Sequence, residues 1–79
     1  GFYDIALRVS SNFTNSAFHV EVDGVDVTGR IAVPGTGGWN VFQWIGKTAV
    51  ALPGGSHVLR IVADQQYFNL NQVRVTATP

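Results

Sequence analysis

The chain has 79 residues, enough for one domain with a thin core, because a domain this short buries only ~60% of the surface its unfolded chain exposes. It contains no cysteine, which excludes a disulfide framework, a cysteine zinc site and a thiol nucleophile. Its five basic and five acidic residues give a formal charge of zero, so neither nucleic acid nor an anionic membrane is an expected partner.

The first predicted strand runs from Phe2 to Val9, where apolar and polar residues alternate as they do in a strand with one buried face. A polar break, SSNFTNS, follows it. The dipeptide Asp23-Gly24 is a strong signal for a tight turn. We therefore expect Ala17–Val22 and Val25–Val33 to form a hairpin.

Glycines mark the ends or bends of the later elements. Gly29 predicts a bulge or bend in the second arm of the hairpin, and Pro53-Gly54-Gly55-Ser56 predicts a turn. No window has the three-and-four apolar spacing of a helix. Four further strands are predicted, at Val41–Ile45, Thr48–Leu52, His57–Ala63 and Leu70–Thr76. Six or seven short strands with glycine-rich links predict an all-β fold, an antiparallel β-sandwich or jelly roll.

No catalytic motif fits its required spacing. Gly46-Lys47-Thr48 resembles the end of a phosphate-binding loop, but Val41 stands where that loop needs a glycine, and no helix follows. Ser56 and His57 are neighbours in an extended segment, where adjacent side chains point to opposite faces. His57 and His19 each stand alone, without a carboxylate at a matching spacing, which favours surface positions over metal ligation. We therefore expect no enzyme.

Aromatic and amide side chains gather in and after two loops. Trp39 follows a glycine-rich loop, and the aromatic pair Tyr67-Phe68 precedes Asn69 and Asn71. The C–H face of a sugar ring stacks on an indole or phenol, while asparagine offers a donor and an acceptor to hydroxyl groups. From the residues alone two interpretations stay open: Trp39 binds sugar, or it covers the open end of the sandwich as a hydrophobic plug.

A series of short motifs carries a resemblance to a known family. They are Gly1-x-Tyr3 leading to Arg8-Val9-Ser10, Val22-Asp23-Gly24, Val33-Pro34 with Thr36-Gly37-Gly38-Trp39, Trp44, Leu52 to His57 (LPGGSH), and Phe68-Asn69-Leu70-Asn71. In this order they resemble roughly the C-terminal two thirds of a family 6 carbohydrate-binding module. Such modules are β-jelly rolls attached to bacterial glycoside hydrolases.

The resemblance implies a sugar-binding cleft in the loops at one edge of the sandwich. In this cleft Trp39 would stack on the sugar, and Asn69, or alternatively Asn71, would hydrogen-bond its hydroxyl groups. The family's facing tyrosine would precede Gly1. Trp44 lies inside a predicted strand and is assigned to packing.

The resemblance also implies that the module's first strands and most ligands of a structural calcium ion precede Gly1. Asp64 is the one residue here expected to contribute a calcium ligand. A jelly roll without its first strands would expose unpaired edges. We therefore expect dimerisation, strand exchange or aggregation of the chain, or a second chain that completes the sandwich.

The expected function follows from this resemblance. Residues 1–79 would form a single, partial module that binds a β-linked polysaccharide of the plant or algal cell-wall type without catalysing a reaction. It would hold an attached glycoside hydrolase near its substrate. The protein would be secreted. Its first residues lack the charged region and apolar core of a signal peptide, so the signal would lie outside this chain, and no apolar run approaches the ~20 residues that span a bilayer. The alternative is a structural or adhesion sandwich with a protein interface and no sugar ligand.

Overall fold

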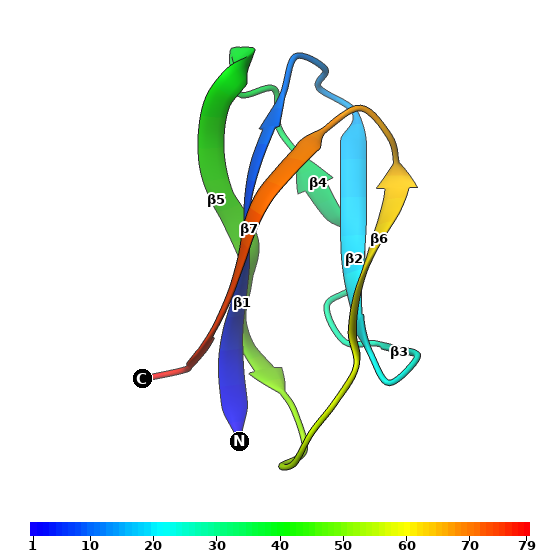
Figure 1. Ribbon diagram of the computed structural model, residues 1–79, viewed down its shortest axis with the longest axis vertical. Coiled ribbons are helices and arrows are strands. Elements are labelled where there is room, and N and C mark those ends of the chain that lie inside the picture. Colours follow the sequence, from blue (N-terminus) through cyan, green and yellow to red (C-terminus); the bar gives the residue numbers. More distant parts are fainter.

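Two antiparallel β-sheets packed face to face form the whole structure, a computed structural model that describes residues 1–79 (Figure 1). The strands are β1 (Phe2–Ser11), β2 (Ser16–Val22), β3 (Val25–Asp26), β4 (Ile31–Val33), β5 (Gly38–Ala51), β6 (Leu59–Gln65) and β7 (Asn69–Ala77). The fold contains no helix, and therefore none that could cross a membrane. The predicted all-β, antiparallel sandwich is confirmed.

The order of the strands leaves two edge positions on each sheet. The first sheet has the order β5-β1-β7, with Leu7 of β1 opposite Ile45 on one side and Val73 on the other. In the second sheet β3 and β4 share one edge of β2, and β6 pairs with the other edge. Strands β5 and β7 of the first sheet, and β6 and the pair β3 and β4 of the second, therefore each lack a partner on one side.

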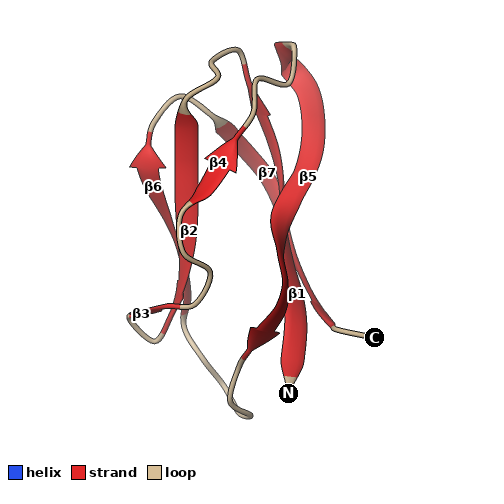
Figure 2. Cartoon of the chain, turned by 180° about the vertical axis from the view of Figure 1, so that it is seen from behind, coloured by secondary structure: helices blue, strands red, loops and turns tan.

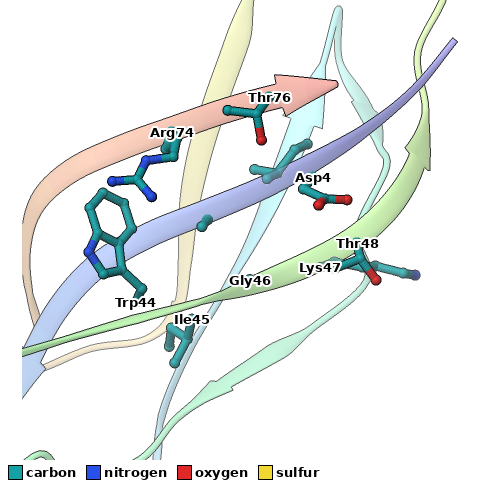
Figure 3. A pocket seen from close by; sticks show the side chains of 10 residues that line it. Asp4, Trp44, Ile45, Gly46, Lys47, Thr48, Arg74 and Thr76 are labelled. Atoms are coloured by element: carbon teal, nitrogen blue, oxygen red, sulfur yellow. The ribbon is translucent and has the colours of Figure 1, made fainter. Parts of the chain in front are cut away.

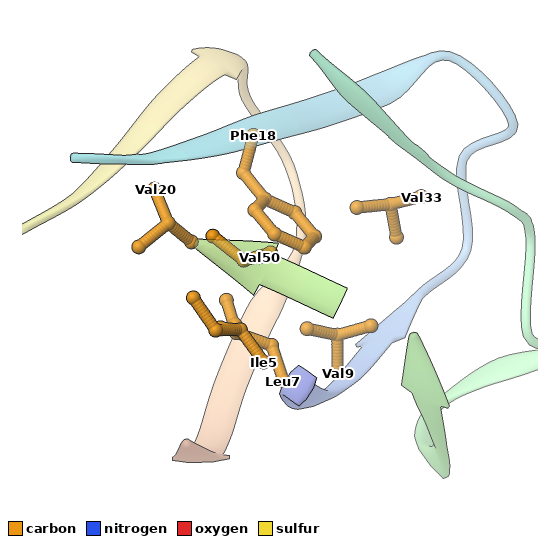
Figure 4. Packing of buried hydrophobic residues seen from close by; sticks show 7 residues of the cluster. All are labelled: Ile5, Leu7, Val9, Phe18, Val20, Val33 and Val50. Atoms are coloured by element: carbon orange, nitrogen blue, oxygen red, sulfur yellow. The ribbon is translucent and has the colours of Figure 1, made fainter. Parts of the chain in front are cut away.

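The core lies between the sheets and is thin, as the chain length predicts. Alternate residues of β1 point into it and meet alternate residues of β2, which confirms the alternation read from the sequence (Figure 4). Seven buried side chains form the cluster: Ile5, Leu7, Val9, Phe18, Val20, Val33 and Val50. Deleting atoms from any of them would leave a cavity that so few neighbours can hardly refill.

The predicted hairpin is present, with a break in its second arm. Asp23 and Gly24 both have positive φ angles, 52° and 82°, the geometry of a tight turn whose twist suits two antiparallel strands. Gly29, with a φ of 72°, separates β3 from β4, and this confirms the bend predicted there. Asp26 accepts hydrogen bonds from the Gly29 and Thr28 amides, which lowers the pKa of its carboxyl.

Strand β5 corrects the sequence analysis, which divided it into Val41–Ile45 and Thr48–Leu52. It is one continuous strand, because the register shift between Tyr3 and Ile5 does not interrupt its pairing with β1. A Cβ atom at Gly46 would stand 1.8 Å from the Ile5 carbonyl oxygen, so only glycine allows this approach. Nearby, Ala49 has a φ of 55° and its amide donates to the Asp4 carboxylate at 3.1 Å.

Candidate functional site

Three loops meet at the end of the sandwich away from both termini (Figure 2). They join β1 to β2, β4 to β5 and β6 to β7. Each brings one large ring to the surface: Phe13, Trp39 at the start of β5, and Tyr67, which are 46%, 38% and 57% exposed. The Phe13 ring lies edge-on to Trp39 with centroids 5.9 Å apart, and 5.2 Å from the tilted Tyr67 ring. We call these three residues the aromatic cluster.

Two buried serines at the end of β1 fix the aromatic cluster in place. Ser11 accepts a hydrogen bond from the Phe13 amide at 3.0 Å and donates one to the Tyr67 carbonyl oxygen at 2.6 Å. Ser10 donates to the Trp39 carbonyl oxygen at 2.7 Å. Because both serines are fully buried, water cannot compete for these bonds.

The backbone beside two of the rings needs this support. Tyr67 has a φ of 79°, which costs of order 1–3 kcal/mol for a residue with a side chain and is frequent at functional sites. Gly37, with a φ of 96°, turns the chain into β5 just before Trp39. Thr36 ties this turn to β1, since its hydroxyl oxygen accepts a hydrogen bond from the Ser11 amide at 3.0 Å.

Unused polar groups surround the rings. The amide nitrogen of Asn69 donates weakly to Ser10, at 3.4 Å, while its side-chain oxygen makes no hydrogen bond. The Trp39 indole N–H and the Tyr67 hydroxyl also make none. Exposed aromatic rings with uncharged donors and acceptors nearby suit a neutral molecule rich in hydroxyl groups.

Comparison with known proteins identifies the family. The family model of carbohydrate-binding module family 6 matches residues 1–77. The chain belongs to this family. Its members are non-catalytic carbohydrate-binding modules, which agrees with the absence of a predicted catalytic motif.

Two solved structures of this family superimpose closely on the module. One is the C-terminal family 6 module of the marine laminarinase LamC from Zobellia galactanivorans, with 28% identity, a TM-score of 0.87, and coverage of 96% of this chain and 61% of that chain. The other is a family 6 module of lichenase 5A from Cellvibrio mixtus, solved with cellotriose, with 36% identity, the same TM-score, and coverage of 100% and 60%.

A curated relative is much longer than this module. The clotting factor G alpha subunit of Tachypleus tridentatus is 31% identical over 80 residues, which include all of this chain but 12% of that protein. The module thus spans about 60% of the two solved modules and a small part of the curated relative.

The structure separates the two asparagines predicted to bind sugar. Asn69 lies beside Trp39, because both are held by Ser10. The side-chain oxygen of Asn71 instead accepts a hydrogen bond from Arg8 at 2.8 Å. Binding by Trp39, Asn69 and Asn71 stays a prediction, but the geometry favours Asn69 over Asn71.

Phe13 was not identified from the sequence as a site residue, and Tyr67 was named without being assigned a role in binding. Phe13 lies within a segment read only as a polar break, and its neighbours are distant in the chain. Tyr67 and Phe68 are adjacent but diverge: Phe68 packs inward, with its ring centroid 6.0 Å from that of Phe18. The signal that could have revealed the cluster is Ser11, a polar residue that continues the alternation of the buried residues Ile5, Leu7 and Val9.

Trp44 does not belong to the core, so its assignment to packing was wrong. Its position in β5 is opposite Arg8, on the face of the sheet that points away from the core, and it is 38% exposed. The Arg74 guanidinium lies over its ring, 4.2 Å from the centroid.

Each histidine has a carboxylate partner, so the expectation that each stands alone was wrong; Glu21 is two positions from His19, on the same face of β2. His19 places one ring nitrogen 2.9 Å from Glu21 and the other 2.8 Å from Asp64. His57 places one nitrogen 2.5 Å from Asp23 and the other 2.9 Å from the Pro53 carbonyl oxygen. Because both nitrogens of each ring face acceptors, the protonated form is favoured, and the pKa of each histidine is raised.

Asp64, the residue expected to ligate calcium, lies in β6 and holds His19 with both carboxylate oxygens, at 2.8 and 2.9 Å. No group of three or more histidine or acidic side chains in the module could hold a metal ion. A calcium role for Asp64 stays a prediction that needs ligands from outside this chain.

Proposed function

We propose that the module binds a β-linked polysaccharide at the aromatic cluster. The observation that carries this proposal is the convergence of Phe13, Trp39 and Tyr67, with Asn69 linked to the Trp39 backbone through Ser10. The related lichenase module was solved with cellotriose, a β-linked oligosaccharide, which supports the choice of linkage. None of these residues is charged, as suits a neutral glycan.

In this proposal Trp39 offers its indole face to the sugar ring. The edge-on contact with Phe13 fixes the plane of that ring. Asn69 accepts a hydrogen bond from a sugar hydroxyl, and the Trp39 N–H and the Tyr67 hydroxyl are available for two more. The exposure of all three rings disfavours the plug interpretation, in which Trp39 would be covered.

The setting of the module is part of the proposal. We propose that it is secreted and that it holds an attached glycoside hydrolase near its polymer, where tethering raises the effective substrate concentration. The two solved relatives come from a laminarinase and a lichenase, which supports this arrangement. A structural calcium ion, with Asp64 among its ligands, is a further proposal.

Affinity electrophoresis tests the site. Wild type is expected to be retarded by at least one of xylan, laminarin, agarose and soluble cellulose, and Trp39→Ala is expected to lose about 1–3 kcal/mol of binding free energy, as other ring-stacking platforms do. Trp44→Ala is the matched control in the neutral polymers laminarin, agarose and cellulose, because Trp44 has the same exposed fraction but lies outside the cluster. Equal retardation of wild type and Trp39→Ala in every polymer would remove Trp39 from the site.

A further inference from the structure

A hollow lies on the outer face of the β5-β1-β7 sheet, the face that points away from the core (Figure 3). It encloses about 320 Å³. The hollow forms where two small residues, Ala6 and Gly46, pair across β1 and β5, because their side chains do not fill the space above the sheet. Trp44 and Arg74 stand at one end, and Asp4, Lys47, Thr48 and Thr76 line the rest. We call this feature the outer hollow.

Arg74 is held in place but its donors are unused. Its guanidinium is stacked on the Trp44 ring, yet it makes no hydrogen bond and no ion pair. Arg8 on β1 differs from Arg74 in this respect. Its guanidinium also lies over an aromatic ring, 4.5 Å from the Phe42 centroid, but it donates a hydrogen bond to Asn71. A guanidinium that is already stacked loses little side-chain conformational entropy when it binds a ligand. Its planar set of N–H donors can therefore bind a carboxylate through two parallel hydrogen bonds.

The charges of the chain are segregated between the sheets. The first sheet carries three cations, Arg8, Lys47 and Arg74, and the single carboxylate Asp4. The other four acidic residues belong to β2, β3, β6 and the β2–β3 turn, with the two remaining arginines. With neutral histidines, the formal charge is therefore +2 on the first sheet and −2 on the rest, although the whole chain is neutral.

Asp4 also lines the hollow, but it forms no ion pair with Arg74. It pairs across the sheet with Thr76, two positions along β7 from Arg74. One of its oxygens accepts hydrogen bonds from the Ala49 amide and, at 2.6 Å, from the Thr78 hydroxyl. These bonds lower the pKa of Asp4 and give its charge a structural role in the β1–β5 pairing.

We propose that the outer hollow binds an acidic saccharide, with the carboxylate of a uronic acid residue held by the Arg74 fork. Thr48 and Thr76, whose hydroxyls make no hydrogen bond in the chain, contact the sugar hydroxyls. The volume is at the lower end of small-ligand sites, which fits one sugar unit or the end of a chain. This site is separate from the aromatic cluster and does not depend on sugar binding there.

Tryptophan fluorescence can observe each site alone, because the chain has two tryptophans. In the variant Trp39→Phe the only tryptophan is Trp44, which lies at the outer hollow. We titrate this variant with trigalacturonate, a short chain of uronic acid units. We expect a saturable change in emission that weakens in about 0.5 M sodium chloride, since exposed charges are then strongly screened. Cellotriose, the neutral match, should give no change.

Variants assign the carboxylate to its partner. Arg74→Gln in the same background is expected to weaken trigalacturonate binding about tenfold or more, the effect of losing a charge-assisted pair. Arg60→Gln, which removes an exposed arginine from β6, should bind like its parent. Circular dichroism checks that both variants are folded.

Three outcomes would overturn the proposal: no saturable response to trigalacturonate, equal affinity of Arg74→Gln, or an equal response to triglutamate. The last would assign the hollow to carboxylates in general. Trp44→Phe reports Trp39 alone, so failure here is distinguishable from failure at the aromatic cluster.

Discussion

Ser11→Ala tests whether the buried serine holds the aromatic cluster together. The substitution removes the acceptor of the Phe13 amide and the donor to the Tyr67 carbonyl oxygen. Each such bond contributes about 0.5–1.5 kcal/mol, so the free energy of unfolding should fall by about 1–3 kcal/mol. A chain of 79 residues has of order 4–12 kcal/mol in total, so this loss is easily measured.

The assay is urea denaturation followed by circular dichroism, with affinity electrophoresis on the same samples. Ser56→Ala is the matched control, because Ser56 lies in an exposed loop and makes no side-chain hydrogen bond. Ser11→Ala should also bind polysaccharide more weakly, since Tyr67 loses a bond that holds its positive φ. Stability within about 0.5 kcal/mol of the control, a normal value for surface changes, together with unchanged binding, would refute the reasoning.

Three further predictions concern packing, charge and edges. Gly46→Ala should destabilise the module by about 1–3 kcal/mol or more, because its Cβ would overlap the Ile5 carbonyl oxygen. The control Gly54→Ala should not destabilise it, because a Cβ there would have no atom within 4 Å. Equal urea midpoints of the two variants would contradict this prediction. The pKa of His57 is raised and that of Asp23 is lowered, so their pairing stabilises the fold fully between the ordinary values of 3.8 for aspartate and 6.5 for histidine. This stabilisation is lost as pH rises through the raised pKa of His57. The stability difference between wild type and His57→Gln should therefore shrink on going from pH 6 to pH 9, and a constant difference would count against the pairing. Because β6 and β7 each leave an edge unpaired, size-exclusion chromatography should show dimers or aggregates of the 79-residue chain, and a stable monomer would oppose this.

Local patterns predicted the strands well, because alternation and turn residues act over a few positions. The run from Phe2 to Val9 and the Asp23-Gly24 turn were read directly from the sequence. The continuity of β5 was not, because it depends on how closely Gly46 approaches Ile5 on another strand. The same limit applied to His57, whose partner Asp23 is 34 positions away.

The site was predicted in part. Trp39 and Asn69 were found because each lies in a recognisable motif. Phe13 was not, since its role depends on two other loops that meet it in space. Trp44 was misplaced because a strand position alone does not show which face of a sheet is buried.

The most direct test of carbohydrate binding at the aromatic cluster is a fluorescence titration of Trp44→Phe, in which Trp39 is the only tryptophan. Oligosaccharides of cellulose, laminarin and xylan are added in turn. A sugar stacked on Trp39 should shift or quench its emission saturably with at least one of the series, and Asn69→Ala should weaken that response. Unchanged emission with every oligosaccharide would contradict the assignment of this cluster as the sugar-binding site.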